Sequence, residues 1–219
     1  MRSFPRKGFF IPLALLSIVL ISLCAYRIIA LNTASPEHER IVYNLGEEVA
    51  PPMFNKMESQ PTDSGARVTA TGCSIEENQA IKGRFPGFDE SKGETSNLGE
   101  PRYLVAEVTF RNDGKTDLNI PIGGIVAQMG AWSNGLEMPL FTYMNEGADT
   151  VVKMVPGEEK LLLLPFSLYE SQFGFSDTWK MLADREFELV LATYPNKVCI
   201  NIGSPHAIEY LDGMQGEKR

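Results

Sequence analysis

The sequence predicts an all-β protein, an antiparallel β-sandwich of short strands that is preceded by one N-terminal transmembrane helix. Three observations lead to this fold class. An apolar run near the N-terminus contains 18 consecutive uncharged residues, from Phe9 to Tyr26. Most of the remaining chain alternates apolar and polar residues with a period of two, which is typical of half-buried strands. Turn signals rich in Gly, Asn and Pro separate these runs.

Composition supports one folded domain with an appendage. The chain has 219 residues, of which 43% are hydrophobic and 22% charged, so wholesale disorder is excluded. Residues 1–36 contain no carboxylate, and the remainder carries 16 basic against 28 acidic side chains. Such an acidic body repels phosphate backbones, and we therefore expect no nucleic-acid partner.

The predicted transmembrane signal-anchor spans residues 9–31, which is long enough to cross a hydrocarbon core of about 30 Å. Basic residues at positions 2, 6 and 7 favour a cytoplasmic N-terminus (1–8) and an extracytoplasmic body. The expected location is therefore the cell membrane, as a single-pass protein. Cleavage near residues 30–34 and lipidation at Cys24 are the two alternatives to a retained anchor.

Beyond the anchor, residues 32–40 read as a polar stalk, 41–212 as the sandwich and 213–219 as a frayed tail. A long loop is predicted over residues 76–101. One short helix is expected over residues 176–184. The alternating runs predict strands over residues 41–49, 67–75, 103–110, 118–122, 125–132, 138–143, 150–155, 160–168, 186–193 and 197–202.

Three sequence features resemble one known group of domains. They are YLVAEVTFRNDG (103–114), VPGEEKLLLLPF (155–166) and the terminal hairpin FELVLATYPNKVCINIG (187–203). In this order they resemble the immunoglobulin-like extracytoplasmic domains, often grouped as telokin-like, of Gram-positive envelope proteins. The resemblance covers about residues 41–203 and implies an immunoglobulin-like sandwich outside the membrane. All three are folding motifs, so the resemblance implies no catalytic residue.

Two cysteines, Cys73 and Cys199, lie in predicted strands outside the anchor. If the first and last core strands are adjacent, the two thiols could form a disulfide, because an extracytoplasmic compartment preserves such bonds. The alternative is a pair of buried free thiols, which are common in protein cores. The sequence leaves both open.

The long loop supplies the candidate binding residues. It is unusually long for a compact domain, and such loops are often functional. Its apolar tip and acidic continuation place Phe85, Phe88, Asp89 and Glu90 as the expected surface contacts. Other aromatic residues that could converge into a contact patch include Trp132, Phe141, Tyr143, Phe173 and Trp179.

No catalytic constellation is found in the sequence. The only histidines are His38 and His206, far apart, so neither a Cys–His nucleophile nor a zinc site is expected. We therefore expect a non-enzymatic module that needs no cofactor or metal and binds an envelope protein or the cell wall. The alternative is a sensor for a small ligand or cation that closes the loop 76–101 over a site. A surface hydrolase is the least supported hypothesis.

Overall fold

The computed structural model describes residues 16–27, 39–51, 65–88, 98–146, 148–174, 176–193 and 196–205. The chain divides into two compact units, residues 1–38 and residues 39–219, which are described separately below. The predicted tail 213–219 and most of the predicted stalk lie outside the described residues.

In the first unit, residues 16–27 form a helix. Its large apolar side chains are exposed on every side, with exposed fractions of, for example, 54% for Leu20 and 68% for Ile21. The rest of the predicted segment 9–31 lies outside the described residues. Within the described ranges, no helix has both the length and the apolar character needed to cross a membrane.

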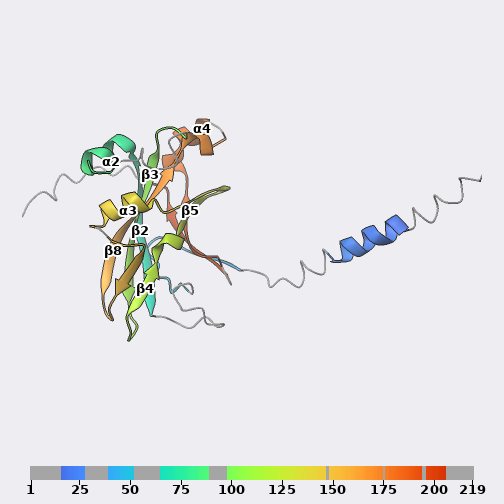
Figure 1. Cartoon of the computed structure of the whole chain (residues 1–219), viewed down its shortest axis with the longest axis horizontal. Helices are drawn as coiled ribbons and strands as arrows, with labels where there is room; N and C mark the ends of the chain where they lie inside the picture. The colour runs from blue at the N-terminus through green and yellow to red at the C-terminus, as the bar shows by residue number, and fades with distance from the viewer. Residues whose placement is uncertain are drawn as a thin grey trace, which may run out of the picture. The chain divides into compact units, whose positions relative to one another are not determined.

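The second unit is a β-sandwich, and this part of the predicted fold class is confirmed (Figure 1). Sheet A has five strands in the order β1 (Arg40–Tyr43), β10 (Lys197–Gly203), β9 (Phe187–Ala192), β5 (Val126–Met129) and β6 (Trp132–Gly135). Sheet B has the order β2 (Ala66–Glu77), β3 (Arg102–Asn112) and β8 (Glu159–Leu168). A two-stranded sheet C pairs β4 (Leu118–Pro121) with β7 (Val151–Met154).

The main core lies between the sheets and follows the predicted alternation. In β3, Leu104, Ala106, Val108 and Phe110 belong to this core and are fully buried. Strand β10 and the first part of β9 contribute every second residue in the same way, because successive side chains of a strand point to opposite faces. At the register shift near the end of β9, Leu191 and Ala192 both face the core. The predicted strands over residues 103–110, 186–193 and 197–202 are therefore confirmed.

One end of the outer face of sheet B is covered by a third layer. Helices α2 (Asn78–Arg84) and α3 (Met138–Met144) lie on this side of the domain (Figure 1). Together with sheet B they enclose a second apolar cluster, whose buried members are Ile81, Phe88, Tyr103, Val105 and Leu140. The part of strand β3 that carries Tyr103 and Val105 is therefore buried on both faces, whereas Glu107, Thr109 and Arg111 farther along its outer face are half-buried.

Two predicted elements are wrong here. Residues 138–143 form helix α3 instead of a strand, because Pro139 suits the first helical turn and Leu140 and Met144 are spaced to share one helix face. The predicted strand over residues 125–132 is interrupted by the β5–β6 turn at Gly130, which has φ +56°. Asn134 is part of β6, and its side chain donates to the Ser167 carbonyl at 2.8 Å.

The segment 76–101 also departs from the prediction of one long loop. Strand β2 continues to Glu77, and α2 follows directly. Tyr143 of α3 donates its hydroxyl hydrogen to the Gly87 carbonyl at 2.7 Å, which holds the segment after α2 against the domain. The sequence hides this because α2 is only seven residues long, too short for a clear helical period.

Asn112 joins two turns that are distant in the sequence. It is fully buried at the end of β3, and its side-chain amide donates to the carbonyls of Thr116 (2.9 Å) and Met154 (3.1 Å). Its side-chain oxygen accepts from the Gly114 N–H at 2.9 Å. Its backbone pairs with Glu158 and Gly157 in the β7–β8 turn. Two of the motifs singled out in the sequence therefore meet at this residue.

Candidate functional site

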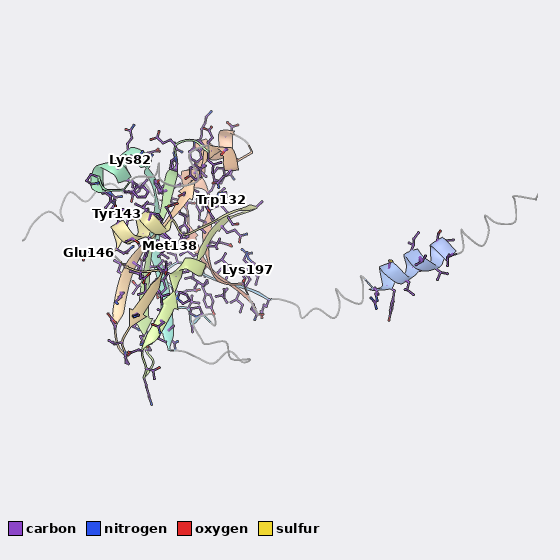
Figure 2. The ribbon with its side chains drawn as sticks, in the orientation of Figure 1. Lys82, Trp132, Met138, Tyr143, Glu146 and Lys197 are labelled. Carbon is purple, nitrogen blue, oxygen red and sulfur yellow. The ribbon has the colours of Figure 1, made fainter. Side chains whose placement is uncertain are left out.

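The outer face of sheet A is the broad surface that the described elements leave uncovered, and we call it the open face. In sheet A the core-facing residues alternate with outward-facing ones, as expected for strands. The open face consists of Arg40, Val42, Val126, Gln128, Glu188, Val190, Lys197, Cys199 and Asn201. Figure 2 shows Lys197 on the side of the domain opposite to Lys82 and Tyr143, which mark the layer over sheet B.

An apolar row crosses the open face from strand to strand. The register pairs Val42 with Cys199, Cys199 with Val190, and Val190 with Val126. Four strands thus place an apolar side chain at the same level of the sheet. Val42 is 41% exposed at the edge, whereas Cys199 and Val190 are buried.

Two long cationic side chains reach across the apolar row. Arg40 reaches from β1 to the Glu188 carboxylate on β9, and Lys197 reaches from β10 to the Gln128 side chain on β5. Both therefore pass over the apolar row, covering it with their aliphatic stems while their charged ends stay near solvent. The open face thus has an apolar row at its centre, which is crossed by the Arg40–Glu188 and Lys197–Gln128 contacts.

The electrostatics of the open face do not favour a nucleophile. The pKa of Arg40 is raised by its hydrogen bond to Glu188 and by the charge of that carboxylate. Burial raises the pKa of the Cys199 thiol, and the nearby charge of Lys197 offsets this only in part. A thiol that stays protonated is a poor nucleophile.

Of the two alternatives left open for Cys73 and Cys199, the structure has the pair of free thiols, and no disulfide joins them. Strands β2 and β10 do lie close together, since the Cys73 thiol donates to the Ile202 carbonyl at 3.4 Å. However, Cys73 belongs to the core, whereas Cys199 lies between the core-facing residues Val198 and Ile200 and therefore points to the open face. The two side chains lie on opposite faces of sheet A, which excludes a bridge.

This placement predicts the reactivity of the thiols. Burial raises the pKa of Cys73 to about 12, so its reactive thiolate is scarce at pH 8. We expect Cys73 and Cys199 of the native full-length protein to resist alkylation at pH 8. After unfolding without reductant, both should react completely, as measured by intact mass. Two thiols that still resist alkylation in the unfolded, unreduced protein would contradict this assignment.

The candidate binding residues of segment 76–101 are only partly described. Phe88 is buried in the second apolar cluster at 5% exposure, and Phe85 packs against the same cluster half-buried. Phe88 contacts the rings of Tyr103 and Tyr143 edge-on. The expected exposed apolar tip is therefore wrong for Phe88, while Asp89 and Glu90 lie outside the described residues. The same holds for His38 and His206.

Several of the aromatic residues that the sequence analysis singled out lie together, but they pack against one another in the interior more than they form a surface patch. Trp132 stacks on Phe173 with ring centroids 5.8 Å apart, and Phe173 contacts Trp179 at 5.7 Å. Arg102 lies over the Trp179 ring at 4.6 Å and also pairs with Glu77. Trp132 and Phe173 are each 8% exposed, so this cluster closes one end of the sandwich and offers little contact surface.

Two further candidates are weaker than the open face. A half-open pocket of about 310 Å³ lies at the end of sheet C, lined by Asp117, Leu118, Asn119, Lys153, Met154 and Val155. Among these described lining residues, no buried polar group is directed at a ligand. In the described part of the chain, no group of three or more His, Cys, Asp or Glu side chains is placed to hold a metal ion.

Sequence reasoning missed the open face, although part of its signal was visible. The alternation that directs Phe187 and Leu189 inward also directs Glu188 and Val190 outward. The sequence does not show which strands are neighbours. Strand β1 lies beside β10 through a parallel pairing of two segments that are far apart in the chain.

Comparisons with known proteins identify a family that matches most of the chain. The profile of the family described as Domain of unknown function (DUF5028) matches residues 40–198. No curated protein gives a significant match.

Solved structures that match this chain include proteins from three bacteria. An uncharacterised β-sandwich protein from Clostridium difficile 630 is 11% identical with a TM-score of 0.40, covering 76% of this chain and 97% of that one. A functionally unknown protein from Listeria monocytogenes EGD-e is 13% identical with a TM-score of 0.41, covering 66% and 79%. The yjhA protein from Bacillus subtilis is 10% identical with a TM-score of 0.40, covering 73% and 98%.

Proposed function

The chain belongs to the family described as Domain of unknown function (DUF5028), and we propose that it is a membrane-anchored, extracytoplasmic binding module without catalytic activity. Its sandwich would bind a protein partner in the cell envelope through the open face. The observation that carries this proposal is the difference between the two outer faces of the sandwich.

That difference is one of burial. On sheet B, α2 and α3 cover the end of the outer face where Tyr103 and Val105 lie and enclose the second apolar cluster there, while Leu161 beyond them is 60% exposed. No described helix covers the open face, yet its central level carries four apolar side chains in register. An antiparallel sheet that simply faces water usually alternates to polar residues on that side. An apolar row at the solvent face therefore favours a contact surface.

The anchor is supported by the first unit. In this helix, Leu, Ile and Val side chains are exposed all round, so no side of it is predominantly polar. Such a helix is more stable in the hydrocarbon core of a membrane than in water. The 18 uncharged residues from Phe9 to Tyr26 and the basic residues before them support a span with a cytoplasmic N-terminus.

We also propose that the sandwich is immunoglobulin-like. Its strand order supports this, because β2-β3-β8 and β10-β9-β5 correspond to the A-B-E and G-F-C orders of immunoglobulin sheets, with β6 in the place of an added strand beside C. The resemblance to telokin-like domains seen in the sequence agrees with this order and stays a proposal.

The location is tested on membranes from cells that make the full-length protein with a C-terminal tag. We expect the protein to stay in the membrane after alkaline carbonate extraction, and the tag to be digested by protease added to intact spheroplasts. Replacing Leu20 and Ile21 by Asp should release the protein, since charges at the centre of a span are costly. A protein that carbonate releases, or a tag that stays protected, would contradict the anchor or its orientation.

The contact role is tested by photo-crosslinking in the same cells. A photoreactive amino acid is placed at Val42, at the exposed edge of the open face, and in a control variant at the exposed Lys82 of α2. We expect a discrete crosslinked product from position 42 and none of the same mass from position 82. Equal labelling from both positions, or no product from position 42, would overturn the open face as the contact surface.

A further inference from the structure

We propose that the partner at the open face is a second copy of this chain, bound face to face about a two-fold axis parallel to the apolar row. This inference rests on the proposed contact role of the open face and names its partner. It is carried by the charge arrangement on the two sides of the row.

The charges on the two sides of the apolar row are opposite in sign. On one side lie Arg40 and Lys197, which are paired in the register of β1 and β10. On the other side lies Glu188, whose register neighbours are Asn201 on β10 and Gln128 on β5. The face therefore has a basic flank, an apolar centre and an acidic flank in that order along the strands.

A two-fold axis along the row makes this arrangement complementary to itself. The rotation places each residue of the row opposite its own counterpart, so that Val42 faces Val42 and Val126 faces Val126. It also exchanges the flanks, and Lys197 of each copy then lies opposite Asn201 of the other, beside Glu188. An isologous interface of this kind repeats every contact twice, so both Lys197–Glu188 pairs form together.

The existing contacts on the open face do not prevent such an exchange. Arg40 is 53% exposed in its pair with Glu188, and surface ion pairs of this kind contribute little to stability. Moving Arg40 and Lys197 aside would uncover Cys199 and Val190 and lengthen the apolar contact. In the dimer, Glu188 of each copy would pair with Lys197 of the other copy in place of its own Arg40, and the exposed Arg40 side chain at the edge of the sheet would keep its charge in solvent.

The test uses charge reversal in the full-length protein in mild detergent. In the variant Lys197→Glu, the introduced carboxylate would face Glu188 in both halves of the interface, and in Glu188→Lys two lysines would meet. Each variant alone should weaken self-association roughly tenfold or more, measured by analytical ultracentrifugation. An equal mixture of the two variants should recover it, because every contact in the mixed dimer pairs a glutamate with a lysine.

The matched control is Lys82→Glu, which reverses an exposed charge on the opposite side of the domain and should leave self-association unchanged. Val42→Asp is a second disrupting variant that avoids the intramolecular ion pairs, since Val42 lies exposed at the edge. A wild-type protein that stays monomeric at about 100 µM, a concentration at which even weak specific contacts associate, would overturn the inference. So would a mixture of the reversed variants that associates no better than either alone.

The photo-crosslinking experiment at position 42 distinguishes a failure of this inference from a failure of the proposed function. A product at position 42 that contains a different protein keeps the contact role and overturns the second copy as the partner. A product with twice the mass of the chain supports both. The absence of any product overturns the contact role, and the self-association inference falls with it.

Discussion

Replacing Asn112 by alanine is expected to destabilise the sandwich by about 3 kcal/mol, which is a large effect for one polar residue. The side chain is fully buried and makes three hydrogen bonds, two as donor to the carbonyls of Thr116 and Met154 and one as acceptor from the Gly114 N–H. Each buried hydrogen bond contributes roughly 1 kcal/mol, and its loss also leaves the backbone partner unsatisfied. The melting temperature should fall by roughly 6–12 °C.

The effect is measured by thermal unfolding followed through tryptophan fluorescence, because both tryptophans, Trp132 and Trp179, lie in the sandwich unit. The matched control is Asn119→Ala, at an exposed position of the adjacent strand β4, with an expected change within about 0.5 kcal/mol. Asn112→Asp is a second informative variant. A carboxylate can accept from Gly114 but cannot donate to the two carbonyls, so a fully stable Asn112→Asp protein would contradict the proposed role of the donor bonds.

Gly65→Ala is expected to be the most damaging glycine substitution in the described part of the domain. Gly65 has φ +79°, and a Cβ at this position would overlap the backbone of Gly114. The Gly65 carbonyl also accepts from the Asp113 N–H at 2.8 Å, so the two segments cannot simply separate. The turn after β3 and the start of β2 can approach this closely only because Gly65 has no side chain.

Gly46 supplies the control that separates backbone strain from steric overlap. It has nearly the same φ, +80°, but nothing lies within 4 Å of the position of its missing Cβ. Gly46→Ala should therefore cost only the penalty of the left-handed conformation, about 1–2 kcal/mol. Gly65→Ala should cost clearly more, roughly 3 kcal/mol or above, or prevent folding. Equal unfolding temperatures for the two variants would show that the overlap with Gly114 relaxes at no cost.

Much of the sandwich could be predicted because its strands carry a strong local signal. In β3 the alternation of Leu104, Ala106, Val108 and Phe110 is regular over the whole strand, and the structure buries all four. The terminal hairpin of β9 and β10 was equally clear. Helix α3 was not, because a seven-residue apolar segment that contains a proline fits a strand and a short helix equally well until its neighbours are known.

The candidate site depended on tertiary relations that no local pattern contains. Alternation alone already implies that Cys199 points away from the core, since Val198 and Ile200 point into it. It does not reveal that Val42 lies beside Cys199, or that Arg40 reaches Glu188 at a separation of 148 residues. Phe88 likewise looked like an exposed tip, and only the packing of α2 and α3 on sheet B shows that it is buried.

Local sequence was sufficient for the clearest strands, for several of the turns that separate them and for the apolar N-terminal segment, because each depends on residues close together in the chain. Three properties came only from the folded domain: which strands are neighbours, which face of each sheet is covered, and that a sheet separates Cys73 from Cys199. Strand pairing and layer packing join residues far apart in the sequence, and many pairings satisfy the same local alternation.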